Sequence, residues 1–158
     1  MKQKKMIDSV VWKLGGAIAP SKIPTMTDFY ITERGTTVFG NNPTEWIGEV
    51  GLIYPSDYGY ATSGGSTVDR SACLNKSMYY WDSYSDCYMN SWLHYTSQYT
   101  ITTRIDAEGY IVGMYKGVSS NINLGKSELD TKPVIYLTPN LKIASGTGSS
   151  TDPFILSS

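Results

Sequence analysis

Residues 100–115 have the sequence TITTRIDAEGYIVGMY, and this stretch decides the predicted fold class. Ile101, Thr103 and Ile105 alternate with more polar residues, which is the two-residue period of a half-buried strand. The Asp-Ala-Glu-Gly segment that follows has turn chemistry, and the apolar run after it returns as a second strand. The sequence therefore predicts a β-hairpin and an α+β fold with small twisted antiparallel sheets, short helices and long loops.

Weaker signals of the same kind divide the rest of the chain. Asp69 precedes the best helix candidate, residues 69–78, and Ser56 is expected to cap a short helical turn. Residues 117–131 are expected to form a polar loop. Short apolar or alternating runs bounded by Gly and Pro predict further strands at residues 10–14, 29–33, 46–54 and 132–137.

Length and charge exclude one class of partner. The chain has 158 residues and a formal net charge of -1 at pH 7. This length suits one domain, which we place at residues 10–158, after a disordered or expression-derived start at residues 1–9. No cluster of Lys and Arg follows the first five residues, so the electrostatic surface that nucleic-acid binding needs is missing. Nucleic acid is therefore not an expected partner.

Cys73 and Cys87 are the two cysteines of the chain. No CxxC pattern or His-Cys cluster suggests a zinc or redox site. We favour a disulfide, which would close a short loop and indicate an oxidising compartment. The alternative is a pair of free, buried thiols. The negative neighbours Asp82 and Asp86 disfavour a reactive thiolate at Cys87, because they raise a thiol pKa.

The start of the chain carries a basic segment but no secretion signal. Asp8, Ser9 and Lys13 interrupt the apolar run that a signal peptide requires, and no stretch is apolar enough to span a bilayer. If the cysteines place the domain outside the cell, we expect it to be part of a longer extracellular or cell-surface protein.

Several segments together resemble a known bacterial module. They are the strings VGLIYPSDYGYA at 50–61, CL at 73–74, Cys87 followed by NSWL at 90–93, KPVIYL at 132–137, and SGTG at 145–148 with DPF at 152–154. From Trp12 onward the chain is similar to the C-terminal module of uncharacterised surface or secreted proteins of low-GC Gram-positive bacteria. Such modules resemble the C-type-lectin-like fold shared with formylglycine-generating enzymes and phage receptor-binding tip proteins.

This resemblance implies an architecture and paired cysteines, and it assigns no catalytic residue. Many members have Arg-Pro where this chain has Lys132-Pro133, and many carry a longer N-terminal part with a membrane or pilin-like leader. These differences leave the implied lectin-like fold in place and bear on how the module is anchored.

Catalysis and metal binding have few candidates. His94 is the only histidine, and the common nucleophile, phosphate-loop and zinc motifs are missing, so we expect neither an enzyme nor a cofactor. A calcium-assisted sugar site is the alternative, with oxygen ligands from one of two clusters. These clusters are Asn41, Asn42 and Glu45, or Asp82, Asp86 and Asn90.

The segment from Met78 to Tyr99 is rich in aromatic residues set among Ser, Asp and Asn. Rigid aromatic anchors with small polar neighbours are typical of recognition surfaces. We expect Trp92 and Leu93 to be core, and Tyr79, Tyr80, Trp81 and Tyr84 to be the more exposed set. A noncatalytic module binding a glycan or a protein on another surface is predicted, the alternative being a structural tip or spacer. The predicted ligand-binding residues are Tyr79, Tyr80, Trp81, Tyr84 and Tyr88.

Overall fold

The structure is a computed structural model that describes residues 6–62, 69–93 and 97–157. Its helices are η1 (Pro20–Lys22), α1 (Met26–Glu33), α2 (Pro55–Tyr60), α3 (Arg70–Leu74), η2 (Met78–Ser83) and α4 (Ser85–Met89), where η denotes a 3-10 helix. Its strands are β1 (Val10–Lys13), β2 (Glu45–Gly48), β3 (Val50–Leu52), β4 (Tyr110–Tyr115), β5 (Val118–Asn123), β6 (Pro133–Ile135), β7 (Lys142–Ser145) and β8 (Ile155–Ser157). The strands form two-stranded antiparallel sheets, which confirms the α+β class.

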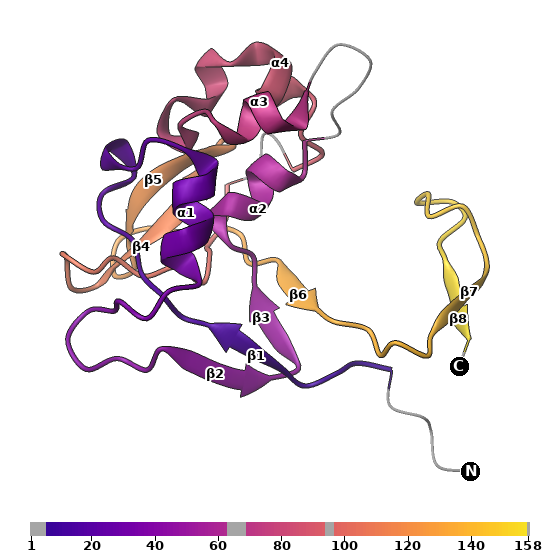
Figure 1. Ribbon diagram of the computed structural model, residues 1–158. Coiled ribbons are helices and arrows are strands. Elements are labelled where there is room, and N and C mark those ends of the chain that lie inside the picture. The colour runs from indigo at the N-terminus through magenta and orange to yellow at the C-terminus, as the bar shows by residue number, and fades with distance from the viewer. Residues whose placement is uncertain (1–5, 63–68, 94–96, 158) are drawn as a thin grey trace.

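Strands β2 and β3 lie consecutively in the chain and pair with two different partners. β2 pairs with β1, and β3 pairs with β6, as the strands at the lower side of Figure 1 show. Ile7 and Leu137 then join the two partners through an antiparallel bridge. We call the meeting of β1, the β2–β3 segment and β6 the three-segment junction. Trp12 of β1 is buried, and a Cβ atom on Gly51 would come within 2.6 Å of its ring. The close packing of the indole on the backbone therefore requires glycine at position 51.

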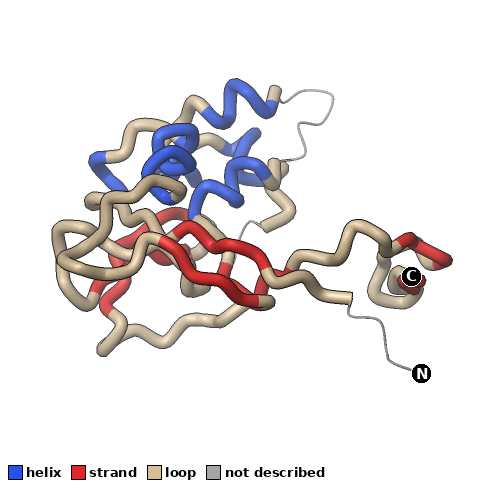
Figure 2. The backbone as a smooth tube through the Cα atoms, turned by 60° about the horizontal axis from the view of Figure 1, so that its bottom comes forward, coloured by secondary structure: helices blue, strands red, loops and turns tan. Residues whose placement is uncertain are grey.

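The helices gather on one side of the strands (Figure 2), and the first of them corrects a prediction. Residues 29–33 were expected as a strand but belong to helix α1. Thr25 caps this helix by accepting a hydrogen bond from the Asp28 N–H at 3.1 Å. Met26, Phe29 and Glu33 are buried, and their spacing of three and four residues is the helical period.

Glu33 links the end of α1 to the beginning of α2. The Ser56 N–H donates to Glu33 Oε1 at 3.1 Å and the Ser56 hydroxyl donates to Oε2 at 2.5 Å. Ser56 was expected to cap the helix, but Tyr54 occupies the N-cap position and Pro55 the first turn. Burial raises the pKa of Glu33 to about 8, although the Ser56 hydrogen bonds and the Arg34 charge oppose the shift.

The core lies between the helices and the β4–β5 hairpin. Isolated antiparallel β-bridges pair Thr103 with Ile111 and Gln98 with Met114. The hairpin predicted for residues 100–115 therefore forms, but as an irregular ladder. The main partner of β4 is β5, although residues 117–131 were expected to be a polar loop. Ser119 and Ile122 are buried in β5 in spite of its polar composition. Contact with η2 and pairing to β4 therefore override the weak strand propensity.

The last strands, β7 and β8, form a hairpin that stands apart from the helices and the other strands in Figures 1 and 2. Every residue of β7 is exposed, as are Phe154 and Ile155. At the other end of the chain, residues 1–5 lie outside the described residues. Residues 6–8, expected to be disordered, instead pair with residues 136–138 through the Ile7–Leu137 bridge. No helix among the described residues is long and apolar enough to cross a membrane.

Candidate recognition surface around the disulfide

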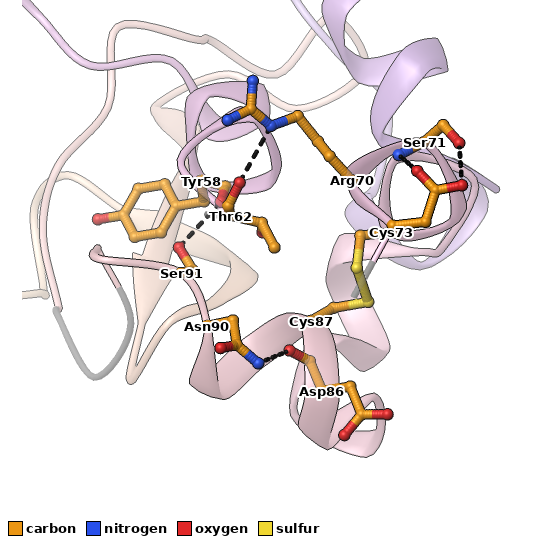
Figure 3. The surroundings of a disulfide bond; sticks show 10 residues. Tyr58, Thr62, Arg70, Ser71, Cys73, Asp86, Cys87, Asn90 and Ser91 are labelled. Atoms are coloured by element: carbon orange, nitrogen blue, oxygen red, sulfur yellow. Dashed lines mark hydrogen bonds between the residues drawn. A yellow bond between two sulfur atoms is a disulfide. The ribbon is translucent and has the colours of Figure 1, made fainter. Parts of the chain in front are cut away.

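Cys73 and Cys87 form a disulfide that joins α3 to α4 (Figure 3). Their Cα atoms are 5.5 Å apart, and both cysteines are buried. The predicted bond is confirmed, and the alternative of two free thiols is wrong. Because the bond ties two short helices together, it limits the ways in which the chain between them can move.

Hydrogen bonds hold the same region against α2 (Figure 3). Arg70 Nε donates to the Thr62 carbonyl at 3.0 Å, and the Ser91 hydroxyl donates to the Tyr58 carbonyl at 3.0 Å. Asp69 caps α3 by accepting from the Ser71 N–H at 2.9 Å and from the Ser71 hydroxyl at 2.7 Å. These two bonds lower the pKa of Asp69, so its carboxylate is charged at neutral pH. The segment that carries the disulfide is therefore bonded to residues 58–62 both at its start, through Arg70, and at its end, through Ser91.

A pocket of about 360 Å³ lies next to the disulfide. The Tyr84 ring forms part of its wall, and the Lys76 ammonium lies 5.3 Å from the centre of that ring. Asp69 and Asp86 add carboxylates to the lining. A ring face beside charged hydrogen-bonding groups suits a ligand with both hydroxyl groups and a flat apolar face.

Of the predicted site residues, Tyr79 and Tyr80 lie on the surface. Their side chains are 38% and 52% exposed, and their rings meet edge to face with centres 4.9 Å apart. Tyr84 is half-buried and lines the disulfide pocket. Three of the five predicted rings are therefore at least partly exposed at the surface.

The other two predicted rings are buried, and the expectation that Trp81 is exposed is wrong. Trp81 is 0% exposed, and Tyr88 is buried with its hydroxyl donating to the Lys116 carbonyl at 2.7 Å. A 3-10 helix has three residues per turn, so Met78 and Trp81 occupy the same side of η2 and both face the core. Tyr79 and Tyr80 lie between them in the sequence and face outward for the same reason.

Trp92 was expected in the core but is 75% exposed, whereas Leu93 is buried as predicted. Ser91 is buried and bonded to Tyr58, so successive residues alternate between inside and outside. Trp92 and the half-exposed Tyr60 border an apolar pocket of about 310 Å³ that includes Leu93. The sequence signal that was missed is Ser91. Its buried hydroxyl, and not the Trp92 indole, holds this segment against the core.

Two of the predicted calcium ligands contact each other, since the Asn90 side-chain amide donates to the Asp86 backbone carbonyl at 2.6 Å. His94 lies outside the described residues. In the described part of the chain, no three His, Cys, Asp or Glu side chains come together as a metal site would require. Glu45, one of the calcium candidates, forms an ion pair with Lys13.

Comparison with known proteins assigns the chain to no family and no known fold. No protein-family model, curated protein or solved structure matches it. The described residues thus form an α+β domain in which Tyr79, Tyr80 and Tyr84 lie at the surface of the segment closed by the Cys73–Cys87 disulfide.

Proposed function

We propose that this domain is a noncatalytic, extracellular recognition module with a C-type-lectin-like fold, and that it binds a glycan at the surface around the disulfide. The observation that carries the proposal is that the η2–α4 segment carries an exposed, edge-to-face ring pair, Tyr79 and Tyr80, and also supplies Tyr84 to the wall of the disulfide pocket. Large exposed rings are costly to leave in water, and together they form an apolar area that a partner can cover.

The chemistry of the pocket favours a glycan over a protein surface. Asp69 and Asp86 can accept hydrogen bonds from hydroxyl groups, while Lys76 can donate them. Tyrosine rings offer flat faces for the C–H groups of a sugar. Because most of the surface is fixed by the disulfide and by helix contacts, little conformational entropy is lost on binding.

The disulfide also supports the proposed location. Disulfides persist in secreted and cell-surface proteins and are rare where thiols are kept reduced. We therefore propose that the domain works outside the cell.

A glycan array followed by calorimetric titration of the best binder tests this function. The variant Tyr79→Ala/Tyr80→Ala is expected to lose about tenfold or more in affinity, the usual size for a buried aromatic contact. The matched control is Tyr115→Ala, which removes an exposed ring on β4. The proposal fails if no glycan binds, or if the double variant binds as tightly as the parent chain.

A second candidate function, a structural tip or spacer domain, is favoured by one observation. Val11, Ile47, Ile135 and Leu137 leave large apolar side chains exposed along β1, β2 and the β6 segment. Exposed apolar groups of this kind often pack against another polypeptide. Light scattering across a concentration series distinguishes the two functions: self-association that Ile47→Lys abolishes supports a packing role, and a monomer that binds a glycan supports recognition.

A further inference from the structure

A second pocket, of about 430 Å³, lies beside β1 and shares no lining residue with the disulfide pocket. Its wall includes the guanidinium-bearing side chain of Arg34, the aromatic residues Trp12, Tyr54 and Tyr136, and the side chain of Lys13. Two cationic residues line it, and no Asp or Glu of the described chain does. A pocket of this volume is the size of a small-molecule site.

Arg34 is held rigidly at this pocket. Its guanidinium lies between the rings of Tyr30 and Tyr54, with its central carbon 4.1 Å from each ring centre. Nη1 donates to Glu33 and to the Ser56 hydroxyl, both at 3.1 Å, and Nη2 donates to Asp57 at 3.3 Å. The plane of the guanidinium is therefore fixed before any ligand arrives.

Arg34 keeps donors for a ligand. A guanidinium carries five N–H groups, and the three bonds above leave the Nε–H and one Nη2 hydrogen without an acceptor among the described residues. Arg34 lines the pocket and is only partly buried, at 24% side-chain exposure. Donors on a planar guanidinium match paired oxygens of an anion, and a carboxylate presents two such oxygens in one plane.

The acids that pair with Arg34 are not part of the pocket lining. Asp57 is its one ionised partner, because burial raises the pKa of Glu33 to about 8 and keeps that carboxyl mostly protonated at neutral pH. Burial also raises the pKa of Asp57. Both acids are absent from the pocket lining, where the charged residues are Arg34 and Lys13, each paired with an acid outside the lining.

The aromatic walls are as rigid as the cation. Trp12 Nε1 donates to the Gly48 carbonyl at 3.0 Å, and the Tyr54 hydroxyl donates to the Lys13 carbonyl at 2.7 Å. Tyr136 meets Trp12 edge to face, with ring centres 5.5 Å apart, and is half exposed. A ligand entering the pocket therefore meets fixed ring surfaces next to a fixed cation.

We infer that this pocket binds an acidic sugar, with the carboxylate of a hexuronic acid on Arg34 and the sugar ring against Tyr136 and Tyr54. Fixed rings favour a sugar over a peptide carboxylate, because a pyranose is rigid and presents apolar C–H groups on its faces. The inference goes beyond the proposed function, since it concerns a different pocket and holds even if the disulfide surface binds nothing.

Titration of the full chain with glucuronate, followed by NMR or calorimetry, tests this site, with neutral glucose as the matched ligand. Glucuronate is expected to bind at least about tenfold more tightly than glucose, because the charge-assisted bonds to Arg34 distinguish the two. A short peptide forms the third arm, with a free C-terminal carboxylate or a C-terminal amide. Equal binding of glucuronate and glucose overturns the inference, and so does binding of the free-carboxylate peptide without binding of glucuronate.

Variants locate the binding. Arg34→Lys keeps the charge but loses the planar set of donors, and is expected to weaken glucuronate binding about tenfold. Since Arg34 also supports the fold, Val11→Glu provides an independent test: it places a carboxylate on the half-exposed rim of the pocket and is expected to weaken binding to a similar extent. The control Ile143→Glu makes the same apolar-to-acid change in the detached hairpin. Unchanged affinity in Val11→Glu, or equal loss in Ile143→Glu, refutes the site.

Discussion

Two antiparallel hairpins of the described chain, β4–β5 and β7–β8, differ in burial. In β4–β5, residues Ile111, Val112 and Met114 are buried against the helices, whereas in β7–β8 almost every residue is exposed. Both hairpins follow from turn residues between extended runs. The difference lies in what covers them: η2 packs on β5, and no element packs closely on β7 or β8. Strand pairing alone therefore builds a hairpin, and a covering layer makes it part of a core.

The largest expected effect comes from removing the residue that covers β4–β5. Trp81→Ala is expected to lower the free energy of unfolding by about 3–5 kcal/mol, because it leaves a cavity in a closely packed core. Trp92→Ala, which removes a largely exposed indole, is expected to stay within about 0.5 kcal/mol of the parent chain. Urea unfolding followed by circular dichroism measures both. Similar losses in the two variants would show that Trp81 does not make the covering layer.

The free energy of unfolding is also expected to depend on pH, because Glu33 is buried between α1 and α2. Its folded pKa of about 8 lies above the ordinary value of 4.5, so the folded state holds the proton more tightly than the unfolded state does. The contribution of protonated Glu33 to the free energy of unfolding is then fully present below about pH 4.5 and is lost as the pH rises through about 8. The expected loss is about 3 kcal/mol between about pH 5 and 7.5. Thermal unfolding across this range checks the slope. Glu33→Gln is expected to flatten it, and an unchanged slope in that variant contradicts the assignment.

The disulfide holds the covering layer closed. Cys73→Ser/Cys87→Ser is expected to cost about 3 kcal/mol, the value for a loop of this length in the chain-entropy model. Denaturant unfolding with and without reductant should show the loss in the parent chain but no further change in the double variant. A parent chain that is equally stable in reductant would count against a supporting role for the bond.

The smallest effect is expected at the other hairpin. Deleting residues 142–158 removes β7 and β8, and should change the free energy of unfolding of the remaining chain by no more than about 0.5 kcal/mol. The matched comparison is Met114→Ala in β4, which is expected to cost about 2–5 kcal/mol. A large loss on deletion would mean that the hairpin packs on the domain in solution.

Strands with an alternating or continuous apolar pattern could be predicted from the sequence. β1, β3, β6 and the pairing of residues 98–104 with β4 follow from side-chain period and turn chemistry. Two of the failures were α1 and β5, and the single strand predicted for residues 46–54 divides into β2 and β3. Thr25 and Asp28 carry the capping signal of α1, but a short apolar run after two prolines also suits a strand. In β5 the sequence VSSNIN has no strong period, and its position is fixed only by β4 and η2.

The candidate site was predicted in composition but only partly in orientation. The disulfide and the exposed Tyr79 and Tyr80 were expected correctly, while Trp81 and Trp92 were assigned to the wrong sides. A run of consecutive aromatic residues does not reveal which rings face inward, because that depends on the local helix type. Arg34 was not singled out at all, since its role comes from Tyr30, Tyr54 and Ser56 meeting in space.

The three-segment junction has a mechanical consequence. Residues 6–8 and 136–138 run antiparallel side by side, and both are fastened to the strands that enclose Trp12. Tension applied to these two segments in opposite directions opens their bridge one hydrogen bond at a time before it loads the helices. A chain pulled through this junction would therefore yield first at the strands, while Tyr79, Tyr80 and the disulfide keep their geometry.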